Sequence, residues 1–383
     1  MKNGFRIFDT DTHVRPTIET LAPYFDERLR RRLPELEPYK RENRRDVEGM
    51  VVGRHSYAFG ERVAYSRMLG KAAAEPGEFR PRSKYMGTRH ATRGAIDDDA
   101  GARLKDMDEE GVDVQFLIGG AGSTSSLNDH EFDVGFMRAY NRYLHEFCGE
   151  DPRRLKAAPP VLLTAVDECV QEIRRWGKER WMVGILPESR NDIPLDHPDM
   201  EPVWKACDEL GLAVVYHSHY AGPPYFPGYL DLWANAFLAR SAAHPWGAMR
   251  ALGSFVGSGI MDRYKNLRFG ILESGCGWLP FWSRRLDDQA EYVLGSIPAL
   301  EHRISDYLTG GRFFSSIEMS EGQDMIEMVI DFLGEGVLMY ASDYPHFECR
   351  FPNSVDCFLS WSLSDSRRRK LLWENPVRFY GEP

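Results

Sequence analysis

The 383-residue sequence predicts an α/β fold, a (β/α)8 barrel built by one domain, and three observations carry this prediction. Apolar runs of strand length alternate with longer amphipathic runs of helix length, several of which end at a glycine. Eight such apolar runs can be counted, which favours a closed barrel over an open doubly wound sheet. Four of the runs end in side chains of the types that bind metal ions, as expected at the C-terminal mouth of a barrel.

The regular alternation begins near residue 100 and continues to residue 342. The predicted strands cover residues 7–13, 112–118, 155–163, 182–186, 212–216, 267–272, 312–317 and 337–342. The predicted helices between them cover residues 102–110, 132–148, 167–176, 201–210, 230–255 with an interruption near Pro245, 279–294 and 323–332. Repeated units of this kind imply right-handed parallel crossovers, which bring the C-terminal ends of all strands to one side.

Residues from about 15 to 95 break this alternation, so we predict one domain over 1–383 with an insertion after the first strand. A helix is predicted for 21–33, and the rest of the insertion lacks clear periodicity. Long irregular segments in compact domains are usually functional, which predicts a cap over the barrel mouth or a subunit contact. Its arginines are predicted to form a solvated or interface surface; they include Arg44, Arg45, Arg80 and Arg82.

The predicted strand ends carry the candidate functional side chains. A charged group at the tip of an apolar strand costs free energy unless a counter-charge compensates it. The candidates are Asp11 and His13 on strand one, His217 and His219 after strand five, Glu273 after strand six, and Asp343 and His346 after strand eight. We therefore predict one metal site at the barrel mouth.

The first strand is predicted to present Phe5, Ile7, Asp9, Asp11 and His13 on one face, because side chains alternate along a strand. Asp11 and His13 would then lie about 6.6 Å apart along the strand and could converge on one ion. Asp9 would lie one layer deeper, and we interpret it as a structural carboxylate that accepts hydrogen bonds.

The strongest candidates have simpler alternatives. Asp343 could be a solvated loop carboxylate, but its position after a buried strand favours a metal ligand. Asp11 could cap a turn beside a core histidine, His13, although the same argument favours a pair of ligands.

Three further candidates remain open at this stage. Glu273 fits a metal ligand, a carboxylate that bridges two metals, or a hydrogen-bonding partner of a ligand equally well. His219 shares a strand face with His217 and is predicted to contact substrate. His346 follows a turn, where it either binds substrate or caps the turn.

Composition limits the class of protein. The formal charge of −10 argues against nucleic acid as the main partner, because phosphate binding requires a basic surface. The sequence has no apolar run of membrane-spanning length, and its first residues lack the apolar stretch of a signal peptide. Six scattered cysteines without a C-x-x-C pair predict reduced thiols, and hence a cytoplasmic protein that contacts no membrane.

Several segments, taken in order, resemble the amidohydrolase-related metal-dependent TIM-barrel family, which includes aminocarboxymuconate semialdehyde decarboxylase and resorcylate-type decarboxylases. They are FDTDTHV, RLKDMDEEGVDVQFL, AYNRYLHEFCGEDPRRLKAAPPV, WKACDELGLAVVYHSH, RYKNLRFGILESGCGWLPFWSRRLD and LMYASDYPH. The resemblance covers most of the chain outside about 15–95. It implies that Asp11, His13, His217 and Asp343 are metal ligands.

The sequence departs from the family pattern at two places. Many relatives have His-x-His where this chain has Asp11-x-His13, and His-Gly-Gly where it has Glu273-Ser274-Gly275. Two carboxylates in place of imidazoles make the site harder and more anionic, which shifts the predicted metal from zinc towards manganese or iron. They also leave room for a second metal that a carboxylate would bridge.

The resemblance implies a metal-dependent hydrolase or non-oxidative decarboxylase that acts on a small carboxylate-bearing substrate. Asp343 and His217 are the predicted catalytic residues, with Asp343 taking or delivering a proton. One alternative is an oxygenase with a dinuclear Mn/Fe or Fe/Fe site, and another is a catalytically silent partner subunit. A homodimer, or a hetero-oligomer with a related subunit, is predicted from the insertion and the resemblance.

Overall fold

The computed structural model describes ten ranges of the chain. These are residues 1–14, 16–42, 55–57, 65–66, 75–76, 99–119, 129–188, 193–217, 236–346 and 349–383. Within them, the strands of the barrel are β1 (Phe8–Val14), β6 (Val114–Gly119), β7 (Leu155–Ala158), β8 (Pro160–Leu162), β9 (Gly184–Glu188), β10 (Ala213–His217), β11 (Arg268–Leu272), β12 (Phe313–Ser316) and β13 (Leu338–Met339). β7 and β8 are two halves of one strand, split at Pro159. All eight predicted strands are therefore present, with ends shifted by a few residues.

The strands form two parallel sheets, in the order β1-β6-β7 and β13-β12-β11-β10-β9-β8. Backbone hydrogen bonds join these sheets on both sides. The segment after β13 is bonded to β1, where His13 donates to the carbonyl of Tyr344 (2.7 Å) and Asp343 donates to that of Asp11 (3.0 Å). On the other side, the amide of Val183, just before β9, donates to Ala157 in β7 (3.1 Å). These bonds close the ring into the predicted (β/α)8 barrel.

The interior of the ring is filled by one apolar cluster, to which every strand position contributes. Its buried members are Phe8, Val114, Phe116, Ile118, Ala158, Leu186, Ala213, Val215, Leu272, Phe314, Met339, Phe379 and Tyr380. The last two come from the C-terminal helix α15 (Asn375–Tyr380), and the Tyr380 ring stacks on Phe116 with centroids 4.2 Å apart. The chain's last helix thus plugs the barrel floor, which leaves the opposite end for a site.

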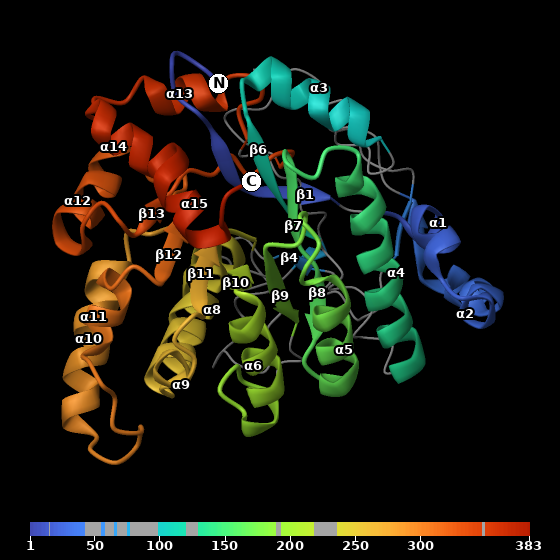
Figure 1. Cartoon of the computed structure of the whole chain (residues 1–383), viewed down its shortest axis with the longest axis horizontal. Coiled ribbons are helices and arrows are strands. Elements are labelled where there is room, and N and C mark those ends of the chain that lie inside the picture. Colours follow the sequence, from blue (N-terminus) through green and yellow to red (C-terminus); the bar gives the residue numbers. More distant parts are fainter. Residues whose placement is uncertain are drawn as a thin grey trace.

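Helices cover the outside of the strands (Figure 1). They are α3 (Ala100–Glu110), α4 (His130–Gly149), α5 (Val166–Trp176), α6 (Glu201–Leu210), α8 (Ala236–Gly257), α9 (Ile260–Arg263), α10 (Leu279–Tyr292), α11 (Ile304–Thr309), α12 (Gln323–Leu333), α13 (Ser354–Leu359) and α14 (Asp365–Arg369). Gly111 and Gly211 end α3 and α6 with φ of 85° and 68°, a conformation that favours glycine. The glycine stops read from the sequence are therefore confirmed.

Two helix predictions are wrong in detail. The helix predicted over 21–33 is divided into α1 (Ile18–Leu21), a 3-10 turn (Ala22–Tyr24), α2 (Glu27–Arg32) and a second 3-10 segment (Leu33–Tyr39). The break has a local cause, because Asp26 begins a new helix by accepting a hydrogen bond from the amide of Leu29 (2.9 Å). In contrast, α8 continues through Pro245, where an interruption was predicted.

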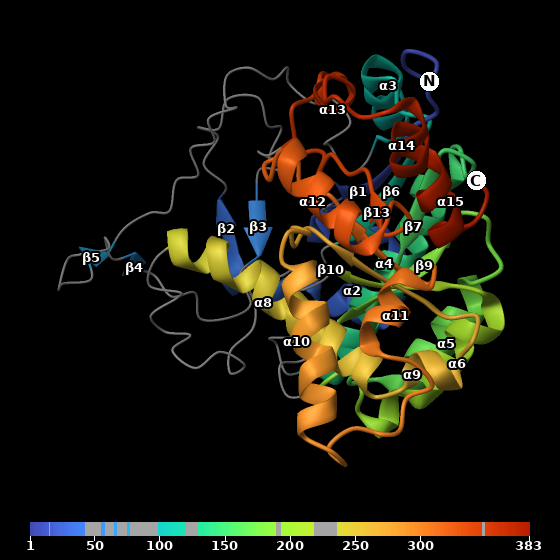
Figure 2. The same ribbon diagram turned by 90° about the vertical axis from the view of Figure 1, so that its left-hand side faces the viewer.

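The described part of the insertion contains two short antiparallel pairs, β2 (Lys40–Glu42) with β3 (His55–Tyr57) and β4 (Tyr65–Ser66) with β5 (Glu75–Pro76). Figure 2 shows β2 and β3 on the side of the barrel away from both chain termini. Arg44, Arg45, Arg80 and Arg82 lie outside the described residues. The cap and the single-domain boundary stay predictions.

All six cysteines are free thiols, and five of them are buried. This agrees with the prediction of scattered, reduced cysteines. Among the helices within the described ranges, none combines the length and the apolar character needed to cross a membrane.

Candidate metal centre

The C-terminal ends of four strand positions converge at the barrel mouth. Asp11 and His13 belong to β1, His217 is the last residue of β10, Glu273 follows β11 directly, and Asp343 and His346 follow β13. Asp11, His13, His217 and Asp343 are each at most 5% exposed. The structure therefore brings together six of the seven predicted side chains, and the seventh, His219, lies outside the described residues.

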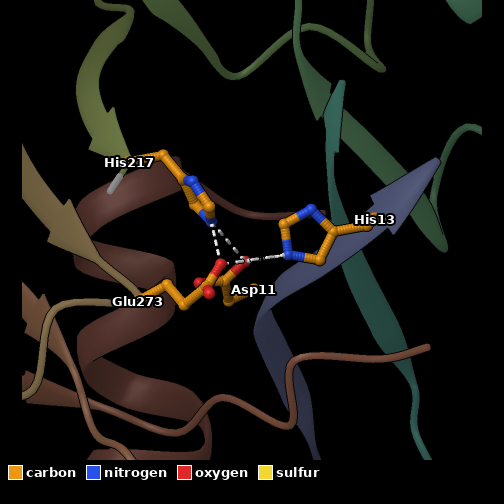
Figure 3. A group of neighbouring side chains, drawn as sticks. All are labelled: Asp11, His13, His217 and Glu273. Atoms are coloured by element: carbon orange, nitrogen blue, oxygen red, sulfur yellow. Dashed lines mark ion pairs between the residues drawn. The ribbon is translucent and has the colours of Figure 1, made fainter. Parts of the chain in front are cut away.

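Four of the side chains form one compact group (Figure 3). Asp11 Oδ1 lies 3.4 Å from His13 Nε2 and 3.6 Å from His217 Nε2. Glu273 Oε2 lies 2.9 Å from His217 Nε2 and 3.7 Å from His13 Nε2. One potential ligand atom from each residue lies within 4.8 Å of the others. Two imidazoles and two carboxylates at this spacing are a donor set that suits a divalent cation.

A second group overlaps the first and shares His13 and Glu273 with it. Asp343 Oδ1 lies 2.9 Å from His13 Nε2 and 2.7 Å from His346 Nδ1. Glu273 Oε2 lies 4.0 Å from the same nitrogen of His346. The rings of His13 and His346 stack with centroids 4.0 Å apart. His346 thus lies at the edge of the cluster, where its side chain is 16% exposed.

The face assignment predicted for the first strand is wrong for Phe5, Ile7 and Asp9, which do not share the face of Asp11 and His13. The pairing of β1 with β6 shifts by one residue between Asp9 and Thr12, which is a β-bulge. Ile7 packs in the cluster between the strands and the helices, whereas Phe8 packs inside the barrel. Asp9 therefore follows Ile7 on the outer face. The extra residue at the bulge returns Asp11 to the inner face.

Asp9 has the structural role predicted for it. Its Oδ1 accepts a hydrogen bond from the amide of Ser342 (2.9 Å), and its Oδ2 accepts one from the Ser342 hydroxyl (2.5 Å). Burial raises the pKa of Asp9 to about 7, against the opposing effect of these bonds. Asp9 is therefore a fully bonded carboxylate that ties β1 to the segment after β13.

Asp11 is bonded differently, although it is only 1% exposed. Its Oδ1 is buried and accepts no hydrogen bond from any residue that the structure describes. Burial raises the pKa of Asp11, although the nearby His217 opposes this shift. A buried carboxylate oxygen costs free energy unless a partner compensates it, and a cation bound between Asp11 and the two imidazoles would be such a partner.

The electrostatics of His217 lead to the same conclusion. Burial lowers its pKa, but the carboxylates of Asp11 and Glu273 outweigh burial and raise the pKa to about 10. Without a metal, the cluster would therefore hold a proton on His217. A divalent cation would replace that proton and neutralise more of the buried negative charge.

Two site carboxylates stand on strained backbone. Glu273 and Asp343 have φ of 45° and 60°, and the only other described non-glycine residue with positive φ is Asn3. Such conformations persist where surrounding bonds enforce them, and they concentrate at functional sites. Here the amide of Glu273 donates to the hydroxyl of Ser316 (3.1 Å), and that of Asp343 donates to the carbonyl of Asp11. These backbone conformations direct both carboxylates into the barrel mouth.

Sequence reasoning missed a supporting residue behind β1. Arg103 on α3 is completely buried, donates to the carbonyl of His13 (2.5 Å) and lies 4.5 Å from the ring centre of Tyr344. The hydroxyl of Tyr344 donates to Asp106, also on α3 (2.6 Å). No sequence signal distinguished these two residues, because α3 carries several other charged side chains.

A family model described as amidohydrolase matches residues 9–381. The chain belongs to the amidohydrolase family. Among curated relatives, a γ-resorcylate decarboxylase from Rhizobium sp. (strain MTP-10005) is 25% identical over 295 residues, which cover 73% of this chain and 86% of that protein. A 2-amino-3-carboxymuconate-6-semialdehyde decarboxylase from Dictyostelium discoideum is 22% identical and covers 74% and 77% of the two chains.

The barrel is also found in solved structures. The 5-carboxyvanillate decarboxylase of Novosphingobium aromaticivorans, complexed with manganese and 4-hydroxy-3-methoxy-5-nitrobenzoic acid, superposes with a TM-score of 0.69. It is 18% identical and covers 99% of this chain and 97% of its own. At this identity the comparison shows the fold, and it confirms the predicted TIM barrel. The resemblance inferred from the sequence motifs is confirmed as well.

Proposed function

We propose that this amidohydrolase-family protein is a manganese-dependent non-oxidative decarboxylase of a small carboxylated aromatic compound. The observation that carries the proposal is the buried cluster at the mouth, where Asp11 Oδ1 has no hydrogen bond from the described residues and faces His13 and His217. Support comes from relatives named as decarboxylases and from the manganese in a structure of the same fold.

Asp11, His13, His217, Glu273 and Asp343 are the residues proposed to hold the ion. When bound, a divalent ion supplies positive charge that attracts the oxygen atoms of an anionic substrate. The carboxylate-rich donor set suits manganese better than zinc. His346, at the edge of the cluster, is proposed to contact the substrate, as is His219.

Decarboxylation breaks the bond between the ring carbon and the carboxylate, releases CO2 and requires one proton at that ring carbon. We assign the delivery of this proton to Asp343, because it is buried and lies beside two imidazoles, His13 and His346. His346 Nδ1, 2.7 Å from Asp343 Oδ1, connects the carboxylate to the more exposed edge of the site. It can therefore return a proton from solvent after each turnover.

The test is CO2 release by the protein purified without chelator and loaded with Mn²⁺. 2,6-Dihydroxybenzoate and 5-carboxyvanillate are suitable first substrates, because the similar proteins are named for acting on such compounds. We expect Mn²⁺-dependent CO2 release from at least one ortho-hydroxylated benzoate, and none from its methyl ester. A fully loaded protein that releases no CO2 across the series would contradict the proposal.

One observation favours a second candidate function, an oxygenase with two redox metals. The two overlapping groups contain three carboxylates and three imidazoles and share His13 and Glu273. These donor atoms would be enough to hold two ions. Metal content and oxygen uptake separate the candidates. One manganese per chain without O2 consumption supports the decarboxylase, whereas two iron or manganese ions with substrate-dependent O2 consumption support the oxygenase.

Assembly and location stay predictions. A homodimer or a hetero-oligomer with a related subunit is supported by exposed apolar side chains on and after α10, such as Phe281 (63% exposed) and Leu294 (86%). Light scattering that shows a monomer at micromolar concentration would count against it. The cytoplasmic location is likewise untested.

A further inference from the structure

The loop that carries Glu273 is held by a carboxylate from the neighbouring loop. Glu321 lies between β12 and α12, and its two oxygens accept hydrogen bonds from the amides of Cys276 (2.8 Å, Oε2) and Gly277 (2.9 Å, Oε1). The thiol of Cys276 also donates to Oε2 (3.4 Å). We call this contact between Glu321 and residues 276–277 the Glu321 clasp.

The backbone of the Glu273 loop is shaped to receive this carboxylate. Gly275 has φ of 68°, and a Cβ atom at this position would lie 2.9 Å from Glu321 Oε1. A left-handed residue followed by two amides that point the same way forms a concave anion-binding nest. In this loop the anion is a side chain of the protein itself, so the nest serves to hold the loop.

The same segment of chain restrains Glu273 at both ends of its loop. Ser316, the last residue of β12, accepts the hydrogen bond from the Glu273 amide (3.1 Å), and Glu321 holds the backbone three and four residues later. Residues 317–320, between these two anchors, line a small cavity of about 20 Å³ together with Asp343. The β12–α12 loop therefore lies beside both strained carboxylates: it holds the loop that carries Glu273, and it lines a cavity together with Asp343.

We propose that Glu321 is a positioning residue, which keeps Glu273 on its strained backbone and aimed at the metal centre through the clasp on Cys276 and Gly277. This inference rests on the proposed function, because it treats Glu273 as part of the metal centre. Residues that orient metal ligands typically change metal affinity by about 10- to 100-fold when they are replaced. We expect the replacement of Glu321 to lower the metal affinity by a factor within this range, although Glu321 is not a proposed metal ligand.

Two substitutions test separately whether the clasp depends on the charge or on the length of the Glu321 side chain. E321Q retains the length but offers one acceptor oxygen, so one of the two amides faces an NH2 group. E321D retains the charge but is one methylene shorter and cannot reach both amides. E327Q is the matched control. It removes the same charge from α12, six residues after Glu321, at a side chain that accepts a hydrogen bond from Gln323 (3.2 Å).

The measurement is calorimetric titration of each metal-free protein with Mn²⁺, together with alkylation of Cys276 followed by peptide mass spectrometry. We expect Mn²⁺ affinity to fall at least about tenfold in E321Q and E321D and to stay at the wild-type value in E327Q. Cys276 is completely buried, so opening of the clasp should also raise its alkylation relative to the half-buried Cys357.

The outcomes are distinguishable when E273Q is measured alongside. If E273Q loses Mn²⁺ affinity but both Glu321 variants retain it, the positioning role is overturned and the proposed metal centre stands, even if Cys276 becomes reactive. If E273Q itself retains full affinity, Glu273 is not part of the centre, and the proposed ligand set fails together with the inference.

Discussion

The two faces of β1 carry two carboxylates that differ in what surrounds them. Asp9 on the outer face and Asp11 on the inner face are both 1% exposed, and only one residue, Thr10, separates them. Both oxygens of Asp9 accept hydrogen bonds from Ser342, whereas Asp11 Oδ1 faces two imidazoles and accepts none from the described residues. The two carboxylates are therefore equally buried. They differ in their hydrogen-bond donors: Asp9 has them, as a structural carboxylate does, and Asp11 Oδ1 is left for a metal ion.

The β-bulge between the two residues produces this difference. With regular alternation, Asp9 and Asp11 would face the same side and compete for the same surroundings. The extra residue turns Asp11 into the barrel, while Asp9 keeps its bonds to the segment after β13. Bulges that re-aim a side chain next to an active site are common in barrels. The comparison predicts that substitutions on the inner face change metal binding and that those on the outer face change stability.

The largest effect is expected for Asp343→Asn on the inner side. The amide retains the shape but removes a negative charge and the proposed proton donor. We predict a folded protein with turnover lowered by at least about 100-fold, the usual scale for the loss of a positioned acid or base. Steady-state CO2 release and metal content on the same sample check this. Full metal content with near-normal turnover would remove Asp343 from the site.

The sharpest test of the comparison is the pair Asp11→Asn and Asp9→Asn. Asp11→Asn removes an anionic ligand, so we expect Mn²⁺ affinity to fall by at least about 100-fold, the upper end of the range for residues that only orient ligands. In Asp9→Asn the amide can still accept from the Ser342 amide and donate to its hydroxyl, so affinity should change little. Calorimetry gives the two affinities directly.

Thermal unfolding provides the second readout for the same pair. Mn²⁺ at about 100 times its Kd should stabilise the wild type by about 2.7 kcal/mol, and a chelator should reverse this. Asp9→Asn should keep this stabilisation, and Asp11→Asn should lose most of it at the same Mn²⁺ concentration. If the two variants behave alike, the division of β1 into a structural and a ligand face is wrong.

Much of this arrangement could be predicted from the sequence, because it depends on local patterns. Eight apolar runs predicted the eight strands, and the convergence of strand ends placed Asp11, His13, His217, Glu273 and Asp343 in one cluster. What the sequence could not show depends on pairing between distant segments. The bulge is a property of the register between β1 and β6, and no pattern within β1 reveals it.

Residues that act from a neighbouring loop were missed for a similar reason. Glu321 contacts Cys276 across 45 positions of sequence, and Arg103 reaches the carbonyl of His13 across 90. Each stands in a segment whose local pattern predicts only a loop or a helix. The single helix predicted over 21–33 was wrong for a different reason. Asp26 caps the start of a new helix and so interrupts the predicted one, and the spacing of apolar residues gives no information about such a cap.

The smallest predicted effect on metal binding concerns a second carboxylate outside the barrel. Glu110, at the end of α3, is 4% exposed and accepts a hydrogen bond from the amide of Val355 (2.8 Å). Burial, with a smaller contribution from Asp9, raises its pKa from 4.5 to about 8, against the effects of the Val355 bond and Lys2. A carboxyl whose pKa is higher in the folded state stabilises the fold fully below its unfolded pKa. That stability is lost as the pH rises from the unfolded pKa of 4.5 through the folded pKa of about 8.

Glu110→Gln keeps an acceptor for Val355 but cannot ionise, so it should escape this loss. We expect the variant to match the wild type at or below about pH 4.5 and to exceed its unfolding free energy at pH 9 by up to about 5 kcal/mol, since the pKa difference of Glu110 is about 3.5 units and one unit corresponds to about 1.4 kcal/mol. Denaturant unfolding of the metal-free proteins across this range measures the difference. Glu109→Gln, at the exposed neighbouring position, is the control and should show no gain that grows with pH. Mn²⁺ affinity should be unchanged in both variants, because Glu110 lies on the structural side of β1; a loss of affinity in Glu110→Gln would mean that the two faces are coupled.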